Sequence, residues 1–232
     1  MRTITIGADP ELFLINPKTG LFVSSIDRVG GSKAFPQSIG KGCAIQEDNV
    51  AVEFNTPPCS VVQEFIDSCE YTLEVLTSIA QDHGLGLSII PSTEFGEDQL
   101  KDPRAQEFGC EPDFNAWANG AKNPRPSADN KALRSAGGHI HIGGVEDMDK
   151  VALIKAMDLF VGVPSVLFDT DTRRRSLYGN PGAFRPKPYG VEYRTPSNAW
   201  LAQKRYQWVF DQTHKAVKFV DEGRSITPEW VS

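Results

Sequence analysis

The sequence predicts an α+β fold built around an antiparallel sheet, and three observations support this class. Segments with strand character are mixed with helical ones, without the regular strand–helix–strand alternation of parallel α/β proteins. Glycine fingerprints that cradle phosphates are absent, because Gly30-Gly31-Ser32-Lys33 does not match a P-loop. The 232 residues are 40% hydrophobic and 23% charged, which is typical of a globular chain with one large domain or two small ones.

The charge and the cysteines exclude several classes of function. The chain has 24 Lys+Arg, 30 Asp+Glu and a formal net charge of −6, so we expect no nucleic-acid partner. No apolar stretch approaches the roughly 18–20 residues of a membrane span, and MRTITIGADPELF lacks the layout of a secretory signal. We therefore expect no membrane association and a cytoplasmic location. The four cysteines form no C-x-x-C pair and are expected to be free, mostly buried thiols: Cys43, Cys59, Cys69 and Cys110.

The first part of the chain predicts a hairpin and a further strand. Residues 3–15 alternate loosely, residues 16–20 read as a turn, and residues 21–23 resume the extended pattern. Residues 49–55 are β-prone and stop at Pro57-Pro58.

The clearest helix follows. Ser60 and Gln63 match a capping box, and Gly84 supplies a left-handed stop. Its apolar residues recur at spacings of three and four: Val62, Phe65, Ile66, Cys69, Leu73, Leu76 and Ala80. Residues 85–90 then predict a strand.

The middle of the chain predicts little regular structure. Residues 92–135 are polar and contain four prolines, which indicates a long ordered loop anchored by Phe114 and Trp117. A short strand over residues 137–143 and a helix over residues 149–161 follow.

The C-terminal part predicts another Pro/Gly loop over residues 181–190 and a strand over residues 191–195. Ser197 is then expected to begin one long amphipathic helix that ends at Gly223.

Two strands carry acidic residues that a core would not require. Asp9 and Glu11 lie two apart and so project from the same side of a strand, a pattern that by itself is more often a solvated face. Glu53 lies in the apolar context Val-Glu-Phe, where a carboxylate is costly unless it binds something. Asp48 falls on the opposite face from Glu53 unless the chain bends.

The segment Gly137-Gly138-His139-Ile140-His141-Ile142-Gly143 places two imidazoles on one side of a strand. A lone histidine is more often a core residue, but an H-x-H pair between glycines favours a metal or phosphate site. For the remaining histidines, His83 and His214, we expect structural roles.

Arginines gather between residues 173 and 194, at Arg173-Arg174-Arg175, Arg185 and Arg194. Glu192 shares a strand face with Arg194. Guanidinium groups suit phosphate oxygens, and a neighbouring carboxylate suits the metal that accompanies phosphate; a salt-bridge network is the alternative for any single pair. Carboxylates of this kind select Mg²⁺ or Mn²⁺ over zinc, so the set indicates nucleotide-dependent phosphoryl transfer without a P-loop.

With these motifs the chain resembles the phage-encoded carboxylate–amine ligases called COOH-NH2 ligase type 2, which are related to glutamine synthetase and γ-glutamylcysteine synthetase. The similarity runs from Gly7 to Trp200. Its most specific piece is R-R-S-L-Y-G-N-P-G-A-F-R-P-K-P-Y-G-V-E-Y-R over residues 174–194, followed by G-G-H-I-H-I-G and G-A-D-P-E-L-F.

The resemblance implies one catalytic domain over residues 1–232, with a glutamine-synthetase-like sheet whose acids hold two or three divalent ions around ATP. It implies these metal ligands: Asp9, Glu11, Glu53, His139 and Glu192. It implies these contacts to the nucleotide phosphates: Arg174, Arg175, Arg185, Arg194 and His139. The chain departs from glutamine synthetase in having Asp9 in place of Glu, in being much shorter, and in lacking a clear counterpart of the substrate-amine pocket.

The implied activity is ATP-dependent amide formation through an acyl phosphate, with Arg185 and Arg194 stabilising the transferring phosphoryl group. His141 and the acids of residues 94–113 are candidates to deprotonate the amine. Two rival hypotheses remain: a zinc hydrolase that uses the H-x-H pair, and a catalytically silent nucleotide-binding module. The carboxylate and amine substrates and the oligomeric state are left open.

Overall fold

The computed structural model describes residues 2–106, 113–124 and 130–226. Within these ranges, eleven strands form one sheet in which the order along the main path is β3-β4-β5-β1-β11-β13-β12-β8-β9. All of its pairings are antiparallel, and β1 (Thr5–Ile15) lies at its centre. The other strands of the main path are β3 (Gln37–Gly40), β4 (Cys43–Asp48), β5 (Ala51–Asn55), β8 (Phe114–Asn115), β9 (Ala121–Lys122), β11 (Gly138–Gly143), β12 (Ala183–Lys187) and β13 (Gly190–Tyr193).

Two short strands pair with the C-terminal end of β1, and two others form a separate two-stranded sheet. The strands β2 (Phe22–Val23) and β6 (Gly86–Ser88) both pair with β1, so the hairpin predicted from the N-terminal segment is confirmed. The strands β7 (Ser92–Glu94) and β10 (Leu133–Ser135) pair with each other.

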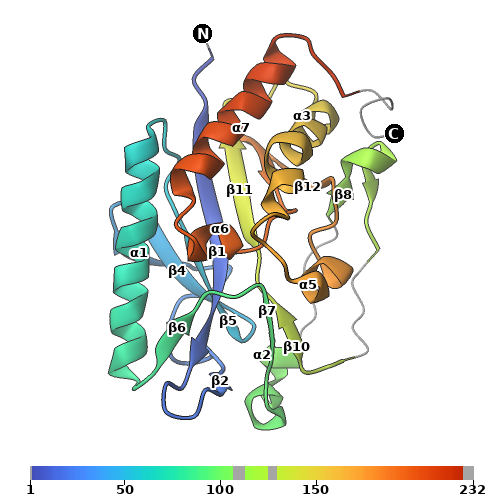
Figure 1. Ribbon diagram of the computed structural model, residues 1–232. Coiled ribbons are helices and arrows are strands. Elements are labelled where there is room, and N and C mark those ends of the chain that lie inside the picture. Colours follow the sequence, from blue (N-terminus) through green and yellow to red (C-terminus); the bar gives the residue numbers. More distant parts are fainter. Residues whose placement is uncertain (1, 107–112, 125–129, 227–232) are drawn as a thin grey trace.

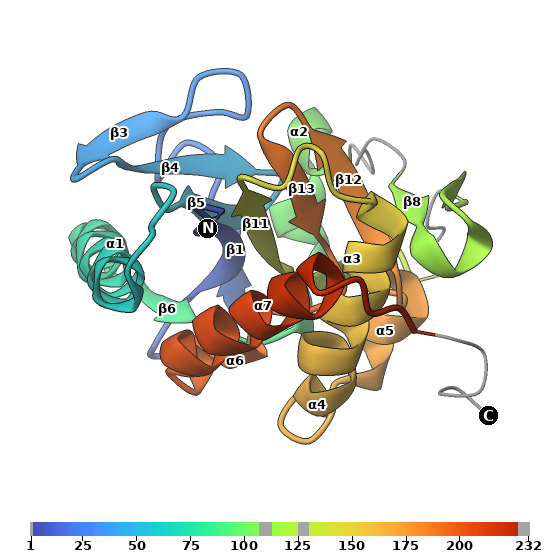
Figure 2. The ribbon, with the colours of Figure 1, turned by 90° about the horizontal axis from the view of Figure 1, so that it is seen from above.

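Three helices cover one face of the sheet (Figures 1 and 2): α1 (Val62–Asp82), α3 (Lys150–Met157) and α7 (Tyr206–Asp221). The helix α7 packs against both α1 and α3. Short helical segments complete the described chain: η1 (Glu97–Leu100), α2 (Pro103–Gln106), η2 (Ala116–Ala118), the π-helical η3 (Asp158–Gly162), α4 (Val163–Ser165), α5 (Thr172–Leu177) and α6 (Ala199–Ala202).

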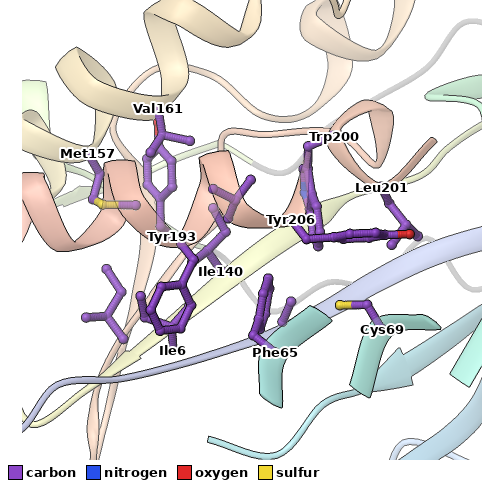
Figure 3. Close-up of a cluster of buried hydrophobic side chains, with 14 of the residues drawn as sticks. Ile6, Phe65, Cys69, Ile140, Met157, Val161, Tyr193, Trp200, Leu201 and Tyr206 are labelled. Atoms are coloured by element: carbon purple, nitrogen blue, oxygen red, sulfur yellow. The ribbon is translucent and has the colours of Figure 1, made fainter. Parts of the chain in front are cut away.

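The main core fills the space between the sheet and these helices (Figure 3). Ile6 of β1, Ile140 of β11 and Tyr193 of β13 point into it and are fully buried. Successive side chains of a strand point to opposite faces, so the residues next to these three project from the other face of the sheet. That face carries Asp9, Glu11, His139, His141, Glu192 and Arg194, and the helical layer anchors the strands that present them.

The predicted class, an α+β fold with a mainly antiparallel sheet flanked by helices, is confirmed. The thiols of Cys43, Cys59 and Cys69 are free and buried, as expected, whereas Cys110 lies outside the described residues. No described helix is long and apolar enough to cross a membrane.

The predicted helix boundaries need two corrections. The capping box is wrong: α1 begins at Val62 without a side-chain cap, and the Gln63 side chain donates instead to Asp67. The single long C-terminal helix is also wrong, because Lys204 adopts a left-handed φ of 51° that separates α6 from α7.

The two predicted loops also contain regular structure. Residues 92–135 include the strands β7, β8, β9 and β10 and three short helices. The Asn115 side chain caps one of these helices, η2. Residues 107–112 and 125–129 lie outside the described ranges. The loop expected over residues 181–190 contains β12. Pro186 fits there because β8 pairs only with Ala183 and Phe184, so the rest of β12 is an edge where a missing N–H is tolerated.

Candidate functional site

The central strand β1 supplies two acidic residues to the polar face, and its two neighbours supply their partners. Asp9 lies opposite His139 of β11, and Glu11 lies opposite Glu53 of β5. In the next row, Glu192 of β13 lies opposite both His141 of β11 and Arg185 of β12. Residues distant in sequence therefore meet because antiparallel pairing places them side by side.

The first group of candidate metal ligands consists of Asp9, His139 and Glu192. One ligand atom from each lies within 4.8 Å of the others. His139 Nδ1 is 3.3 Å from Asp9 Oδ1 and 3.8 Å from Glu192 Oε1. We call this set the Asp9 group. All three residues are buried.

Cations surround the Glu192 carboxylate. Lys187 Nζ lies 2.8 Å from Glu192 Oε2, Arg185 lies 3.8 Å from Oε1, and Arg194 donates to Oε1. Burial and the Asp9 charge favour protonated Glu192, but Arg194 and the two histidines outweigh them and lower its pKa to about 2. Glu192 is therefore ionised across the physiological range.

Asp9 is held as a carboxylate in the same way. Burial favours its protonated form, but His141 and His139 outweigh burial and hold the pKa of Asp9 well below its usual range. His141 Nε2 lies 3.0 Å from Asp9 Oδ2, and its Nδ1 contacts the Tyr189 hydroxyl. Nδ1 of His141 thus contacts Tyr189, whereas Nε2 lies beside the Asp9 carboxylate without a hydrogen bond among the described residues.

The second group, which we call the Glu11 group, consists of Glu11, Asp48 and Glu53. Oxygen atoms from these three carboxylates also lie within 4.8 Å of one another. The Gly137 N–H donates to Glu11 Oε2 at 2.6 Å. Burial raises the pKa of Glu11, and burial together with the Asp9, Asp48 and Glu11 carboxylates raises that of Glu53 well above its usual range.

The position of Asp48 corrects the expectation from strand alternation. The strand predicted over residues 49–55 is present over Ala51–Asn55, and a tight turn in which Asn49 has a left-handed φ of 58° separates it from β4. Asp48 ends β4 and pairs with Ala51 of β5, so it belongs to a different strand from Glu53. The bend that the sequence left open is therefore present, and it adds Asp48 to the Glu11 group.

Both groups fit a divalent cation. Carboxylates packed this closely repel one another, and the raised pKa of Glu53 shows that the bare group favours retaining a proton. A bound dication would relieve this repulsion. Five of the six side chains offer carboxylate oxygen, which suits Mg²⁺ or Mn²⁺.

The arginines expected to join the site separate into two sets. Arg185 and Arg194 lie at the Asp9 group; Arg194 Nε is also 3.5 Å from Asp113 Oδ2. Arg174 and Arg175 lie on α5, not on a loop. The guanidinium of Arg174 is buried and donates to the carbonyls of Thr195 and Pro196, at 2.9 and 2.8 Å. Arg174 thus buttresses the segment that follows β13.

Arg175 contacts an acid other than the six candidate metal ligands. It donates to the Asp169 carbonyl, and its guanidinium is 3.5 Å from the Asp169 carboxylate. Its contact to the nucleotide phosphates stays a prediction. The helix α5 turns successive side chains in different directions, so neighbouring arginines cannot all face one site.

Lys187 and Tyr189 are the site residues that sequence reasoning missed, whereas Asp113 belongs to the acids of residues 94–113 that it had proposed. The signal for Lys187 was its spacing of two from Arg185, which puts both on one face of a strand. That signal was hidden because the proline between them favoured a loop.

Two family models match the chain. The model of glutamate-cysteine ligase family 2 (GCS2) matches residues 5–157, more than half of the chain. The chain belongs to glutamate-cysteine ligase family 2. The model of the phage phiEco32-like COOH.NH2 ligase-type 2 family matches residues 130–220, which confirms the resemblance seen in the sequence motifs.

Individual proteins match the chain less closely than the two family models do. No curated protein matches the chain. A solved structure described as a GmaS/ADP complex matches with 12% identity and a TM-score of 0.46, over 92% of this chain and 55% of its own. The chain thus spans about half the length of that protein.

In this GCS2 family member, the Glu11 group opens onto a cavity of about 390 Å³. Glu11, Asp48, His139 and Arg194 line one part of it, and Phe13, Ile26, Val50 and Leu133 are among its apolar lining residues. Phe13 is two residues beyond Glu11 on β1 and so projects from the same face. The two family matches overlap at residues 130–157, which contain β11 and its histidines.

Proposed function

We propose that the protein is an ATP-dependent carboxylate–amine ligase that forms an amide bond through an acyl phosphate. The observation that carries this proposal is the arrangement around β1. The Asp9 group on one side adjoins the cations of β12 and β13, and the Glu11 group on the other side adjoins a cavity. Family membership supports the same class of reaction.

The Asp9 and Glu11 groups would each hold one Mg²⁺ or Mn²⁺. When bound, such ions neutralise phosphate charge and act as Lewis acids during phosphoryl transfer. The chain's own contribution is to fix the ligands on paired strands, where they cannot move independently.

In the first step, an oxygen of the substrate carboxylate attacks the γ-phosphorus of ATP. The new P–O bond forms as the bond from the γ-phosphorus to the bridging oxygen breaks, which releases ADP and leaves an acyl phosphate. Arg185 and Arg194 lie where they can take up the negative charge of the transferring group. Lys187 offers a third cation beside Glu192.

In the second step, the amine nitrogen attacks the acyl carbon, the C–N bond forms, and the C–O bond to phosphate breaks. The amine loses one proton and inorganic phosphate leaves. We assign His141 to positioning, because it lies beside the Asp9 carboxylate and contacts the Tyr189 hydroxyl. Asp113, which lies beside Arg194, is a described acid of the 94–113 segment that reaches the site.

The decisive experiment measures ADP release with Mg²⁺ and ATP against a panel of carboxylates and amines, glutamate first. A ligase releases ADP in repeated turnovers only when both substrates are present. The mass of the product equals the combined mass of the carboxylate and amine substrates less one water. Zinc-dependent hydrolysis that is indifferent to ATP would replace this proposal with the hydrolase. ATP binding without ADP release for any pair would favour the silent module.

A further inference from the structure

We propose that the cavity beside the Glu11 group is the acceptor subsite, and that it selects an amine with an apolar body and a carboxylate bound by Lys33. This inference rests on the proposed ligase function and names the acceptor chemistry that the function leaves open. An amino acid and a short peptide share this chemistry.

The cavity opens at the Glu11 group and reaches the Asp9 group at one point. The described residues that line it do not include Arg185, Lys187 or His141, which gather at the Asp9 group. His139 and Arg194 do line it, so the cavity reaches the place where the acyl phosphate would form. Its occupant can therefore meet the acyl carbon while Arg185 and Lys187 stay with the phosphates.

The walls of the cavity favour an apolar body. Phe13, Ile26 and Val50 belong to a small core on this face of the sheet, and each also lines the cavity with Leu133. The volume of about 390 Å³ falls in the range of about 300–1,000 Å³ that is usual for small-molecule sites. At the reacting end, Glu11 and Asp48 line the cavity.

Lys33 supplies a cation at the exposed rim of this cavity. Within the described parts of the chain, its ammonium group has no hydrogen bond or ion pair. An anionic group on the acceptor would therefore meet a cation whose charge no neighbouring carboxylate already occupies.

The turn that carries Lys33 is held in place before any ligand arrives. Glu47 Oε1 accepts hydrogen bonds from the backbone N–H groups of Arg28, Val29 and Gly30, at 3.1–3.3 Å. Gly31 has a φ of 72°, and a Cβ there would lie 2.5 Å from the Ile45 carbonyl oxygen. Such pre-organisation lowers the entropy lost when a ligand binds.

The test uses calorimetric titration of the dipeptide Ala-Leu into the protein with Mg²⁺ and a non-hydrolysable ATP analogue. We expect Ala-Leu to bind about tenfold more tightly than its C-terminal amide, because the amide lacks the charge that Lys33 meets. The more polar Ala-Gln should bind more weakly than Ala-Leu. Free leucine, titrated in parallel, shows whether the site takes an amino acid or needs a peptide.

Variants then assign the effect to Lys33. We expect Lys33→Met to abolish the preference for the free carboxylate and Lys33→Arg to retain it. The matched control, Lys18→Met, removes an exposed lysine from the distant turn after β1 and should change nothing. Equal affinities for acid and amide, an unchanged preference in Lys33→Met, or no binding of any probe would overturn the proposal.

Two further outcomes separate the hypotheses. If the ATP analogue displaces Ala-Leu, the cavity holds nucleotide and the acceptor assignment is wrong. If Ala-Leu binds through Lys33 while no substrate pair releases ADP, the ligase function fails and the carboxylate-binding subsite stands.

Discussion

Arg175 and Arg185 both lie within residues 174–194 but have different surroundings in the fold, and they form a matched pair for a first prediction. Arg185 lies 3.8 Å from Glu192, whereas Arg175 bonds to Asp169. We expect Arg185→Met to lower the kcat for ADP release by roughly 10²- to 10³-fold, as loss of one charge-stabilising donor does. Arg175→Met should leave kcat within a few-fold of the wild type. Equal losses in the two variants would contradict the separation of the arginines.

Asp48 carries a second prediction, because the turn at Asn49 brings it to Glu11 and Glu53. We expect Asp48→Asn to weaken Mn²⁺ binding at the Glu11 group by at least roughly tenfold while the Asp9 group keeps its ion. Electron paramagnetic resonance of titrated Mn²⁺ would then show one tight site in place of two. Two tight sites in the variant would exclude Asp48 as a ligand.

At the scale of single residues, the sequence indicated which acids and histidines gather on one face of the sheet. Glu53 stood out because a charged group in an apolar strand needs a partner, whereas Asp9, Glu11, His139 and Glu192 were assigned as ligands through the family resemblance. The place of Asp48 in the site could not be predicted without knowing that a turn follows it. This turn depends on the left-handed φ of Asn49, which asparagine tolerates but which the sequence does not indicate. The contact of Arg175 with Asp169 depends on α5, a helix that the sequence did not predict.

The strand β11 tests how far one element controls the site. Gly138 precedes His139, and a Cβ on Gly138 would overlap the Ser197 carbonyl and lie 2.5 Å from Trp200 Nε1. Trp200 Nε1 itself donates to the Gly138 carbonyl at 3.0 Å. We expect Gly138→Ala to lower the free energy of unfolding by about 2–3 kcal/mol, since backbone and a buried tryptophan must shift.

The matched control for this change is Gly86→Ala in β6. A Cβ there meets Ile15 Cγ2 at 3.7 Å, an ordinary contact, so we expect a change between zero and a gain of about 1 kcal/mol. Urea denaturation followed by circular dichroism measures both. A Gly138→Ala protein as stable as Gly86→Ala would show that the close packing at β11 can relax.

Elements were predicted best where hydrophobic periodicity was long or strict. The helix α1 and the strand β11 appear nearly as expected because packing against the core selects them. The strand β12 was missed because Pro186 is tolerated only at an unpaired edge, and strand order is a tertiary property. The break between α6 and α7 was not predicted, because a lysine in the left-handed region gives no sequence signal, whereas a glycine at that position would have indicated one.

The whole molecule should respond to divalent cations in a pH-dependent way. Burial and neighbouring carboxylates raise the pKa of Glu53 in the folded protein above its unfolded value. Without metal, this group's contribution to stability is present at low pH and is lost as the pH rises through the raised pKa, because ionisation adds charge to a crowded site. Mg²⁺ binds the ionised form, so its stabilising effect should grow over the same range.

We therefore expect the rise in Tm caused by Mg²⁺ to be small at about pH 5 and larger at about pH 8. Differential scanning calorimetry with Mg²⁺ or EDTA measures it. Glu53→Gln removes the titrating group and should flatten the dependence. An Mg²⁺ effect that falls as the pH rises would contradict the assignment.

At the scale of the molecule, the sequence indicated the class of fold but not the layout of the site. The motif order along the chain gives no hint that Glu53 lies on the strand beside β1 while Glu192 lies two strands from β1 on its other side, because strand order is a tertiary property. The geometry of the two groups had to come from the register of β5, β1 and β11.

The spacing of Asp9 and Glu11 along β1 fixes the distance between the backbone positions of the two acids. Alternate residues of an extended strand are separated by roughly 6.6–6.8 Å, and a strand bonded on both edges can neither stretch nor shorten. If each group held one ion, the two ions would be anchored at alternate residues of this pleat, one beside the cations of β12 and β13 and the other beside the cavity. Each ion could then serve its own reactant, one the leaving phosphate and the other the group that receives the acyl unit.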